Sequence, residues 1–220
     1  MLDELTQESL MVPVSGKVQL HLRRIRGAGT GDAQPVLMVH GAAEDGHIFY
    51  SHVGRGLACY LARNGFDVFV ADLRGKGKSW PAINQHSDFG FHELITEDLP
   101  ALSATVARAC GGREQTWVTH SLGGPLAAAA VARAGAEVLG VRQMVHFAAR
   151  RQQSVGGWRR RFFVDGMWNR LGAIGVAFEG YLPANRLGLG TSRESARCFR
   201  DGLAWSNSDH WLDQIGRAHV

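Results

Sequence analysis

The sequence predicts an α/β protein with a doubly wound, mostly parallel sheet, and two observations lead to this fold class. Short runs of almost continuously apolar residues occur at 35–41, 67–71, 116–120 and 143–148. Stretches with the 3.6-residue period of helices lie between these runs. Strands that are buried on both faces have such runs, and parallel strands joined by helices form an open sheet with right-handed crossovers.

Two alternating segments precede the first apolar run. Residues 10–14 and 18–25 alternate apolar and polar side chains, and Ser15-Gly16 separates them. This pattern predicts an N-terminal β-hairpin. The glycine-rich stretch 27–31 predicts the loop that leads into the first buried strand.

Helix signals separate the buried strands. Residues 49–63 have helical period and are followed by Asn64-Gly65, which ends the helix. The stretch 98–110 begins with an aspartate and has a proline two residues later, a pattern typical of a helix start. The strand at 116–120 turns abruptly into an alanine-rich helix that ends near Ala134. The run 143–148 then predicts a fourth buried strand.

The composition changes from residue 149 onward. Residues 149–201 are rich in glycine and arginine, contain many aromatic side chains and lack another strong buried-strand pattern. We interpret this region as a helical cap inserted over one edge of the sheet. The chain is therefore divided into a core at 1–149 and a cap at 150–214.

The composition excludes several classes of protein. Of the 220 residues, 45% are hydrophobic and 20% are charged, as in an ordinary soluble domain. The longest apolar run, at 126–132, is much shorter than the roughly 20 residues that cross a bilayer. Residues 1–10 contain acids and no base, unlike a secretory signal. Three scattered cysteines without a CxxC pair favour a reducing, cytoplasmic location and argue against a disulfide framework or a zinc site.

The basic residues give no reason to expect a nucleic-acid partner. The net charge is +4, and only three of the 24 basic residues are lysines. Such an excess of arginine is typical of GC-rich coding DNA. No GxGxxG or Walker pattern is completed, so we expect neither a nucleotide, nor a metal, nor another cofactor.

The strongest chemical signal is the segment Thr-His-Ser-Leu-Gly-Gly at 119–124, where a strand meets a helix. A nucleophile elbow needs a serine on a strained turn with small neighbours. The helix that starts beside Ser121 directs backbone N–H groups toward a developing oxyanion. The usual motif is GxSxG, and Thr119 stands in place of its first glycine. We expect the β-branched side chain of Thr119 to crowd the turn.

Two further segments follow the first two buried strands. The motif His-Gly-Ala-Ala at 40–43 ends the first strand, and its small residues allow the Ala42 N–H to face the same oxyanion as the Leu122 N–H. We interpret His40 as a packed histidine at the end of the strand. The motif Asp-Leu-Arg-Gly-Lys-Gly-Lys-Ser at 72–79 ends the second strand. Asp72 and Arg74 are interpreted as a pair that anchors this loop.

The order and spacing of these three segments resemble the α/β-hydrolase fold family over about residues 10–150. The matching patterns are HG, DxRGxGxS and xHSxGG. The segment 180–190 is similar to the cap of a bacterial group of α/β hydrolases. The resemblance implies an esterase- or lipase-like serine hydrolase, with Ser121 as nucleophile and the amides of Ala42 and Leu122 as oxyanion hole. The residues that would shape the elbow are His40, Gly41, His120, Gly123 and Gly124.

The acid and the histidine of a catalytic triad are missing from this pattern. In this family they follow the nucleophile, on loops after later strands. Of the downstream histidines, we interpret His146 as a core or strand-end residue and His210 as part of a polar loop or helix cap. His219 lies in 215–220, which reads as an in-frame translation of a common sequencing adapter. We therefore interpret 215–220 as an artefact and expect a C-terminally truncated, inactive fragment that lacks the final strands.

Three functional hypotheses stay open. The first is a serine hydrolase for an ester, or another acyl bond, of an apolar small molecule or lipid, in which a histidine outside this chain takes the proton. The second is a non-catalytic α/β-hydrolase-like binding protein, which Thr119 and the missing base allow. The third is contact of the basic cap with a membrane surface through Arg159-Arg160-Arg161. For the stretch 158–168 we favour another interpretation, in which the arginines form a solvated outer face of the cap and the Trp and Phe side chains beneath them line an acyl pocket.

Overall fold

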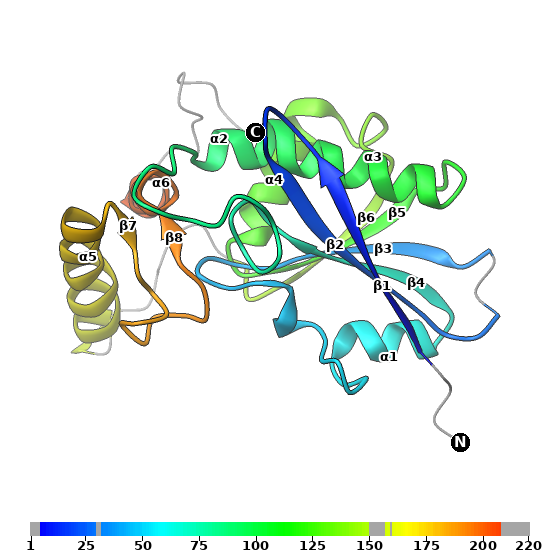
Figure 1. Ribbon diagram of the computed structural model, residues 1–220, viewed down its shortest axis with the longest axis horizontal. Coiled ribbons are helices and arrows are strands. Elements are labelled where there is room, and N and C mark those ends of the chain that lie inside the picture. The colour runs from blue at the N-terminus through cyan, green and yellow to red at the C-terminus, as the bar shows by residue number, and fades with distance from the viewer. Residues whose placement is uncertain (1–4, 30–31, 150–156, 159, 208–220) are drawn as a thin grey trace.

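A six-stranded sheet forms the centre of the computed structural model, which describes residues 5–29, 32–149, 157–158 and 160–207 (Figure 1). The strand order is β1-β2-β4-β3-β5-β6. The strands are β1 (Thr6–Pro13), β2 (Gln19–Arg26), β3 (Gln34–Val39), β4 (Phe66–Asp72), β5 (Gln115–His120) and β6 (Val141–Phe147). β1 and β2 form an antiparallel hairpin, and β2 also pairs antiparallel with β4. From β4 to β6 the pairing is parallel, as the sequence predicts.

Helices cover both faces of this sheet (Figure 1). α1 (Leu57–Arg63) lies on one face, and α3 (Leu99–Ala109) and α4 (Gly123–Ala134) lie on the other. Successive side chains of a strand point to opposite faces of the sheet, so β3 contributes side chains to two apolar clusters. Leu37 packs in the cluster that includes residues of α3 and α4, and Met38 packs in the cluster that includes residues of α1. Short helical turns complete the core at η1 (Gly46–Ile48), α2 (Phe91–Glu93) and η2 (Leu94–Asp98).

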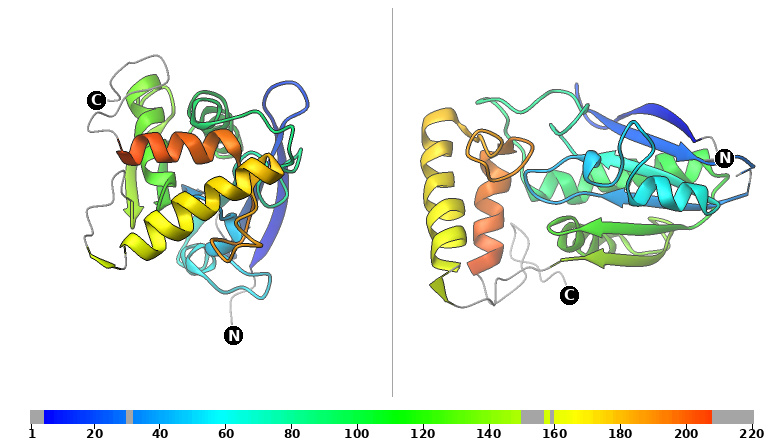
Figure 2. Two further views of the ribbon diagram at one scale, coloured as in Figure 1. Left: turned by 90° about the vertical axis from the view of Figure 1, so that its left-hand side faces the viewer. Right: turned by 90° about the horizontal axis from the view of Figure 1, so that it is seen from below.

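The cap lies beyond one end of the strands, on the side where β3 and β5 end (Figure 2). It consists of η3 (Arg160–Leu171), α5 (Gly172–Glu179), β7 (Tyr181–Leu182), β8 (Glu194–Ser195) and α6 (Ala196–Asn207). The predicted helices are present, and the two-stranded sheet β7-β8 is an addition that the sequence did not indicate. Phe199 and Leu182 of the cap pack in one cluster with Ala43 of the core, so the cap rests on the loop after β3.

Two expectations are wrong in instructive ways. The helix expected over 49–63 covers only 57–63, because Gly54 and Gly56 have φ of 77° and 107°, which no α-helix accommodates. The strand at 143–148 forms as β6, but it is not buried: Val145 and Phe147 are 41% and 46% exposed. His146, interpreted as a core or strand-end residue, is exposed and lies one residue before the end of β6. β6 is the last strand of the sheet, so one of its sides lacks a strand neighbour in the described chain.

Several expectations fall on residues outside the described ranges. They include His210, His219, the adapter-like segment 215–220 and the side chains of Arg159-Arg160-Arg161. The division into core and cap at residue 150 also stays a prediction. None of the described helices has the length and apolar character to cross a membrane. The three cysteines, Cys59, Cys110 and Cys198, are buried thiols.

Candidate active site

Ser121 occupies a strained turn between β5 and α4. Its φ is +48°, in the left-handed region that L-residues rarely adopt. The turn is held by backbone hydrogen bonds on both sides: the Ser121 N–H donates to the Phe147 carbonyl at 2.9 Å, and the Ser121 carbonyl accepts from the Gly124 N–H at 3.1 Å. A nucleophile elbow has this strand-turn-helix geometry.

Two glycines let the loop after β3 lie against this turn. A Cβ atom on Gly41 would lie 2.8 Å from the Cβ of Ser121, and one on Gly123 would lie 2.6 Å from the His40 carbonyl oxygen. Real Cβ atoms do not approach other atoms so closely, so neither position accepts a side chain without a backbone shift. The structure therefore brings together the two motifs that the sequence placed at different strand ends.

Thr119 fits the elbow without crowding it, contrary to the expectation from its branched side chain. Thr119 is completely buried, and its Oγ1 hydrogen-bonds to Nδ1 of His146 at 2.6 Å. Space for this hydroxyl exists because Gly124 lies opposite: a Cβ there would lie 3.3 Å from Thr119 Oγ1. The first glycine of the usual motif is thus replaced by a threonine that bonds to the neighbouring strand.

Of the three successive N–H groups after β3, the first and the third bind carboxylates and the second does not. The Gly41 N–H donates to Oε2 of Glu44 at 2.9 Å, and the Ala43 N–H donates to Oε2 of Glu194 at 2.9 Å. The Ala42 N–H between them donates to no acceptor within the described residues, and the same holds for the Leu122 N–H. The backbone N–H groups of Ala42 and Leu122, on two adjoining loops, are therefore left without an acceptor in the described chain.

Glu44 also links the loop to β5. Its Oε2 lies 2.9 Å from Nδ1 of His120, the residue before Ser121. One carboxylate oxygen thus fixes both the Gly41 amide and the His120 ring. No sequence motif predicted this role of Glu44, and the only local signal is that Glu44 directly follows His-Gly-Ala-Ala.

His40 has a structural role in this arrangement. It is completely buried, its Nδ1 donates to the Gly41 carbonyl at 2.8 Å, and its Nε2 accepts the Leu73 N–H at 3.1 Å. Burial lowers the pKa of the imidazole, so the neutral ring is favoured. Nε2 joins the end of β3 to the end of β4, and Nδ1 is used within the loop after β3, as expected for a packed strand-end histidine.

Asp72 and Arg74 anchor loops, but they do not bind each other. Asp72 accepts the N–H groups of Gly46 and Lys78, at 2.8 and 3.0 Å, and hydrogen-bonds to His21. Burial alone would raise the pKa of Asp72, but these hydrogen bonds outweigh it and lower the pKa.

Arg74 instead binds the carboxylate of Asp98 through Nε and a terminal nitrogen, at 3.0 and 2.6 Å. Burial nevertheless raises the pKa of Asp98 to about 6. The helix start expected at Asp98 is wrong, because α2 and η2 already run from Phe91 into α3 and Asp98 has helical backbone angles. Its side chain binds Arg74 and caps no N–H of α3.

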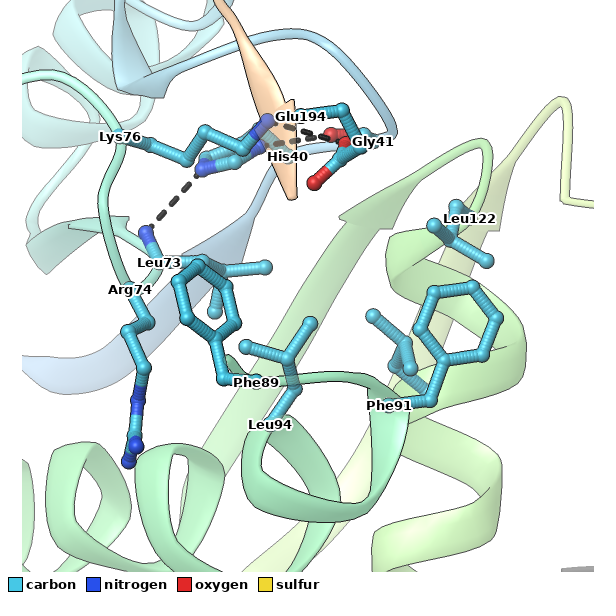
Figure 3. Close-up of a pocket in the computed structure, with 11 residues that line it drawn as sticks. His40, Gly41, Leu73, Arg74, Lys76, Phe89, Phe91, Leu94, Leu122 and Glu194 are labelled. Atoms are coloured by element: carbon cyan, nitrogen blue, oxygen red, sulfur yellow. Dashed lines mark hydrogen bonds and ion pairs between the residues drawn. The ribbon is translucent and has the colours of Figure 1, made fainter. Parts of the chain in front are cut away.

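A small pocket adjoins the elbow (Figure 3). It encloses about 10 Å³, on the scale of one water molecule. The aromatic and aliphatic part of its lining consists of Leu73, Phe89, Phe91, Leu94, Leu122 and Leu126. Its polar end contains His40, Lys76 and Glu194, which lie together in Figure 3, whereas the guanidinium of Arg74 points away from that group.

Among the residues that the structure describes, no histidine or acid hydrogen-bonds to the hydroxyl of Ser121. Within the described residues, Ser121 Oγ makes no hydrogen bond at all. His120 hydrogen-bonds to Glu44, and His146 hydrogen-bonds to Thr119. The described part of the chain also contains no group of three His, Cys, Asp or Glu side chains that could hold a metal ion.

Comparison with known proteins settles the family. The model of the alpha/beta hydrolase fold family matches residues 34–161, more than half of the chain. The chain belongs to the α/β hydrolase fold family. The match includes the loop after β3, the elbow and the loop after β4, the three segments on which the sequence resemblance rests.

The chain is also similar to individual members of the superfamily. It is 32% identical over 97 residues to sterol esterase 2 of Saccharomyces cerevisiae, a match that covers 41% of this chain and 18% of the esterase. A candidate lipase from Sulfolobus solfataricus matches with a TM-score of 0.52 and 16% identity, over 70% of this chain and 47% of that one. The haloalkane dehalogenase DatA of Agrobacterium tumefaciens matches with a TM-score of 0.50 and 17% identity, over 77% of this chain and 51% of the dehalogenase.

These similarities show the fold and do not select a reaction. The chain spans about half the length of the two solved structures and less than a fifth of the sterol esterase. A lipase-type and a dehalogenase fold match equally well, so the chemistry has to be argued from the residues of the site.

Proposed function

We propose that the chain is the N-terminal catalytic part of a serine hydrolase that cleaves ester bonds of apolar small molecules or lipids. Ser121 is the nucleophile, and the N–H groups of Ala42 and Leu122 form the oxyanion hole. The observation that carries the proposal is the strained Ser121 turn at φ +48° beside two N–H groups that have no acceptor in the described chain.

The first chemical step follows from this arrangement. Ser121 Oγ attacks the carbonyl carbon of the ester, its proton passes to a base, and the carbonyl electron pair moves onto oxygen. The two N–H groups stabilise the oxyanion that forms. When the oxyanion collapses, the bond to the alcohol breaks, the alkoxide takes the proton, and the acyl group stays on Ser121. Water then releases the acid by the same steps.

The base and its acid lie outside the described residues in this proposal. The triad order of the family places them after the nucleophile on loops that follow later strands. The matched structures are about one and a half times as long as this chain. A histidine of the complete gene product, placed beside Ser121 Oγ, would complete the site.

Ester chemistry is favoured over the other reactions of the superfamily. A serine at the elbow attacks acyl carbon, whereas haloalkane displacement by this fold uses a carboxylate nucleophile. The 32% identity to a protein named sterol esterase supports an ester substrate. The aromatic and aliphatic pocket lining suits an apolar acyl group, although a volume of about 10 Å³ requires lining side chains to move aside on binding. We also propose a cytoplasmic location, which the three unpaired cysteines favour.

A fluorophosphonate probe tests the nucleophile directly. The complete product of the natural gene is incubated with the probe, digested with trypsin and analysed by mass spectrometry. We expect the label on the peptide of residues 114–133, which contains Ser121, and its complete loss in Ser121→Ala. Labelling of the 220-residue chain in parallel shows whether this part alone has an activated serine.

Ser9 provides the matched control. Its Oγ lies 2.9 Å from Nε2 of His21, whose Nδ1 lies 2.8 Å from Asp72, so it superficially resembles a triad serine. We expect Ser9→Ala to leave labelling unchanged and the peptide of residues 1–17 to stay unlabelled. Absence of any label on Ser121 in the complete protein would contradict the enzyme and favour a non-catalytic binding protein of this fold.

A further inference from the structure

The cap holds the backbone of Ala43 from both sides. The Ala43 N–H donates to Oε2 of Glu194 in β8, 151 positions later in the chain, at 2.9 Å. The Ala43 carbonyl accepts the N–H groups of Thr191 and Ser192, both at 2.9 Å. Ala43 has φ of +52° and is completely buried. A single short cap segment thus fixes the residue that follows the free Ala42 N–H.

The carboxylate that binds Ala43 is buried together with a lysine. Glu194 and Lys76 are 5% and 4% exposed, and Lys76 Nζ lies 2.9 Å from the same Oε2 that accepts the Ala43 N–H. Lys76 also donates to the Arg193 carbonyl. Figure 3 shows Lys76 and Glu194 meeting beside His40 and Gly41. Because a buried charge without a partner is costly, neither side chain is dispensable while the other is present.

Carboxylates flank the oxyanion hole on both sides. Glu44 accepts the Gly41 N–H and Glu194 accepts the Ala43 N–H, which leaves the Ala42 N–H between them. A carboxylate so close to a developing oxyanion opposes its formation unless a cation compensates the charge. Lys76 is such a cation for Glu194.

We propose that Glu194 and Lys76 are positioning residues for the oxyanion hole. Glu194 fixes the loop so that the Ala42 N–H faces the oxyanion, and Lys76 cancels the negative charge that Glu194 places there. This inference rests on the proposed function and extends it to the cap: the cap segment at 190–194 is part of the catalytic apparatus, although none of its residues touches the reacting atoms.

Substitutions at both positions separate this role from simple stabilisation. Glu194→Gln keeps an acceptor for the Ala43 N–H but loses the ion pair. Lys76→Met leaves the carboxylate uncompensated, and Lys76→Arg retains the charge. The double variant Lys76→Met with Glu194→Gln removes both charges. Glu179→Gln is the control, because it breaks an exposed cap ion pair with Arg186 and removes none of the hydrogen bonds to Ala43.

The readout is the rate at which a fluorophosphonate labels Ser121 in the complete protein, because this reaction also develops negative charge on an oxygen in the hole. We expect Lys76→Met to slow labelling by about 100-fold and Glu194→Gln by about tenfold. The double variant should recover to within about threefold of Glu194→Gln, and Lys76→Arg and Glu179→Gln should stay close to the parent. For p-nitrophenyl butyrate, kcat should fall and KM should change little.

Hydrogen exchange and thermal melting complete the test. In Glu194→Gln we expect faster amide exchange at Ala43, whereas Glu179→Gln leaves it unchanged. If Ser121 is labelled and all variants label at the parent rate, the inference is wrong and the proposed function stands. A labelling loss that only follows the loss of Tm, with no recovery in the double variant, also overturns it. A parent protein without label on Ser121 overturns the proposed function itself.

Discussion

β2 and β6 have comparable sequences and opposite environments. Each strand contains a histidine among apolar residues, at His21 and at His146. In β2, which lies between β1 and β4, His21 and Leu22 are almost completely buried. In β6, at the end of the sheet, Val145 is 41% exposed and His146 is exposed as well. A local sequence pattern therefore predicts a strand, while the burial of that strand depends on which neighbours the rest of the chain supplies.

The largest expected difference concerns apolar side chains of the two strands. Leu22→Ala removes a completely buried side chain from the core and should lower the free energy of unfolding by about 2–5 kcal/mol. Val145→Ala removes a half-exposed side chain and should cost less than about 1 kcal/mol. Urea unfolding followed by circular dichroism measures both. Equal losses of unfolding free energy in the two variants would show that β6 is covered in solution and would contradict its assignment as an exposed strand.

Substitution of the histidine should also cost more stability in β2 than in β6. His21 bonds to Asp72 at 2.8 Å and to Ser9 at 2.9 Å in a buried site, so His21→Gln should cost about 1–3 kcal/mol. His146 bonds only to Thr119 among the described residues and has access to solvent, so His146→Gln should cost about 0.5 kcal/mol or less. Thermal melting at pH 7.5 provides the measurement. A larger cost at His146 would contradict the assignment of β6 as the exposed strand.

The buried carboxylates of Asp98 and Asp72 should make the free energy of unfolding depend on pH. Burial raises the pKa of Asp98 from 3.8 to about 6 in the folded chain, in spite of its bond to Arg74. The folded state therefore binds more protons than the unfolded state between these values, and this group's contribution to stability is lost as pH rises from about 4 to 6. We expect a decline on the order of 1–3 kcal/mol across this range that is absent from Asp98→Asn.

Asp72 contributes with the opposite sign. Its pKa is lowered in the folded chain, so its stabilising contribution is present above 3.8 and is lost as the pH falls through the folded value. Unfolding free energies measured from pH 3 to 8 separate the two groups. A parallel pH dependence in the parent chain and in Asp98→Asn would refute the role of Asp98.

Local sequence features predicted the elbow, but not the residues that support it. Ser121, Gly123 and the short loop after β3 lie in contiguous motifs whose backbone demands are local, so their geometry was foreseeable. The contact between Ala43 and Glu194 joins residues 151 positions apart and depends on how the cap folds back, which no periodicity encodes. The exposure of β6 was missed for the same reason, because burial is decided by elements distant in the sequence.

The smallest expected effect compares the turns after β5 and β6. Ser121 and Ala148 have φ of +48° and +52°, in a region that costs an L-residue roughly 1–2 kcal/mol and costs glycine little. Glycine also loses more chain entropy on folding, so Ser121→Gly should be more stable than Ser121→Ala by only about 0.5–1 kcal/mol. Ala148→Gly should give a gain of similar size.

The turns at Ser121 and Ala148 have similar backbone strain, but only the turn at Ser121 should matter for labelling. Ser121→Gly removes the hydroxyl and should abolish fluorophosphonate labelling, whereas Ala148→Gly should leave the labelling rate unchanged. Differential scanning calorimetry of the three variants, combined with the labelling assay, measures both properties. If Ser121→Gly is more stable than the parent, the native serine lowers stability. A catalytic elbow needs this serine in spite of the cost, whereas a binding protein of the same fold does not. A destabilising Ser121→Gly would remove this argument for a catalytic serine.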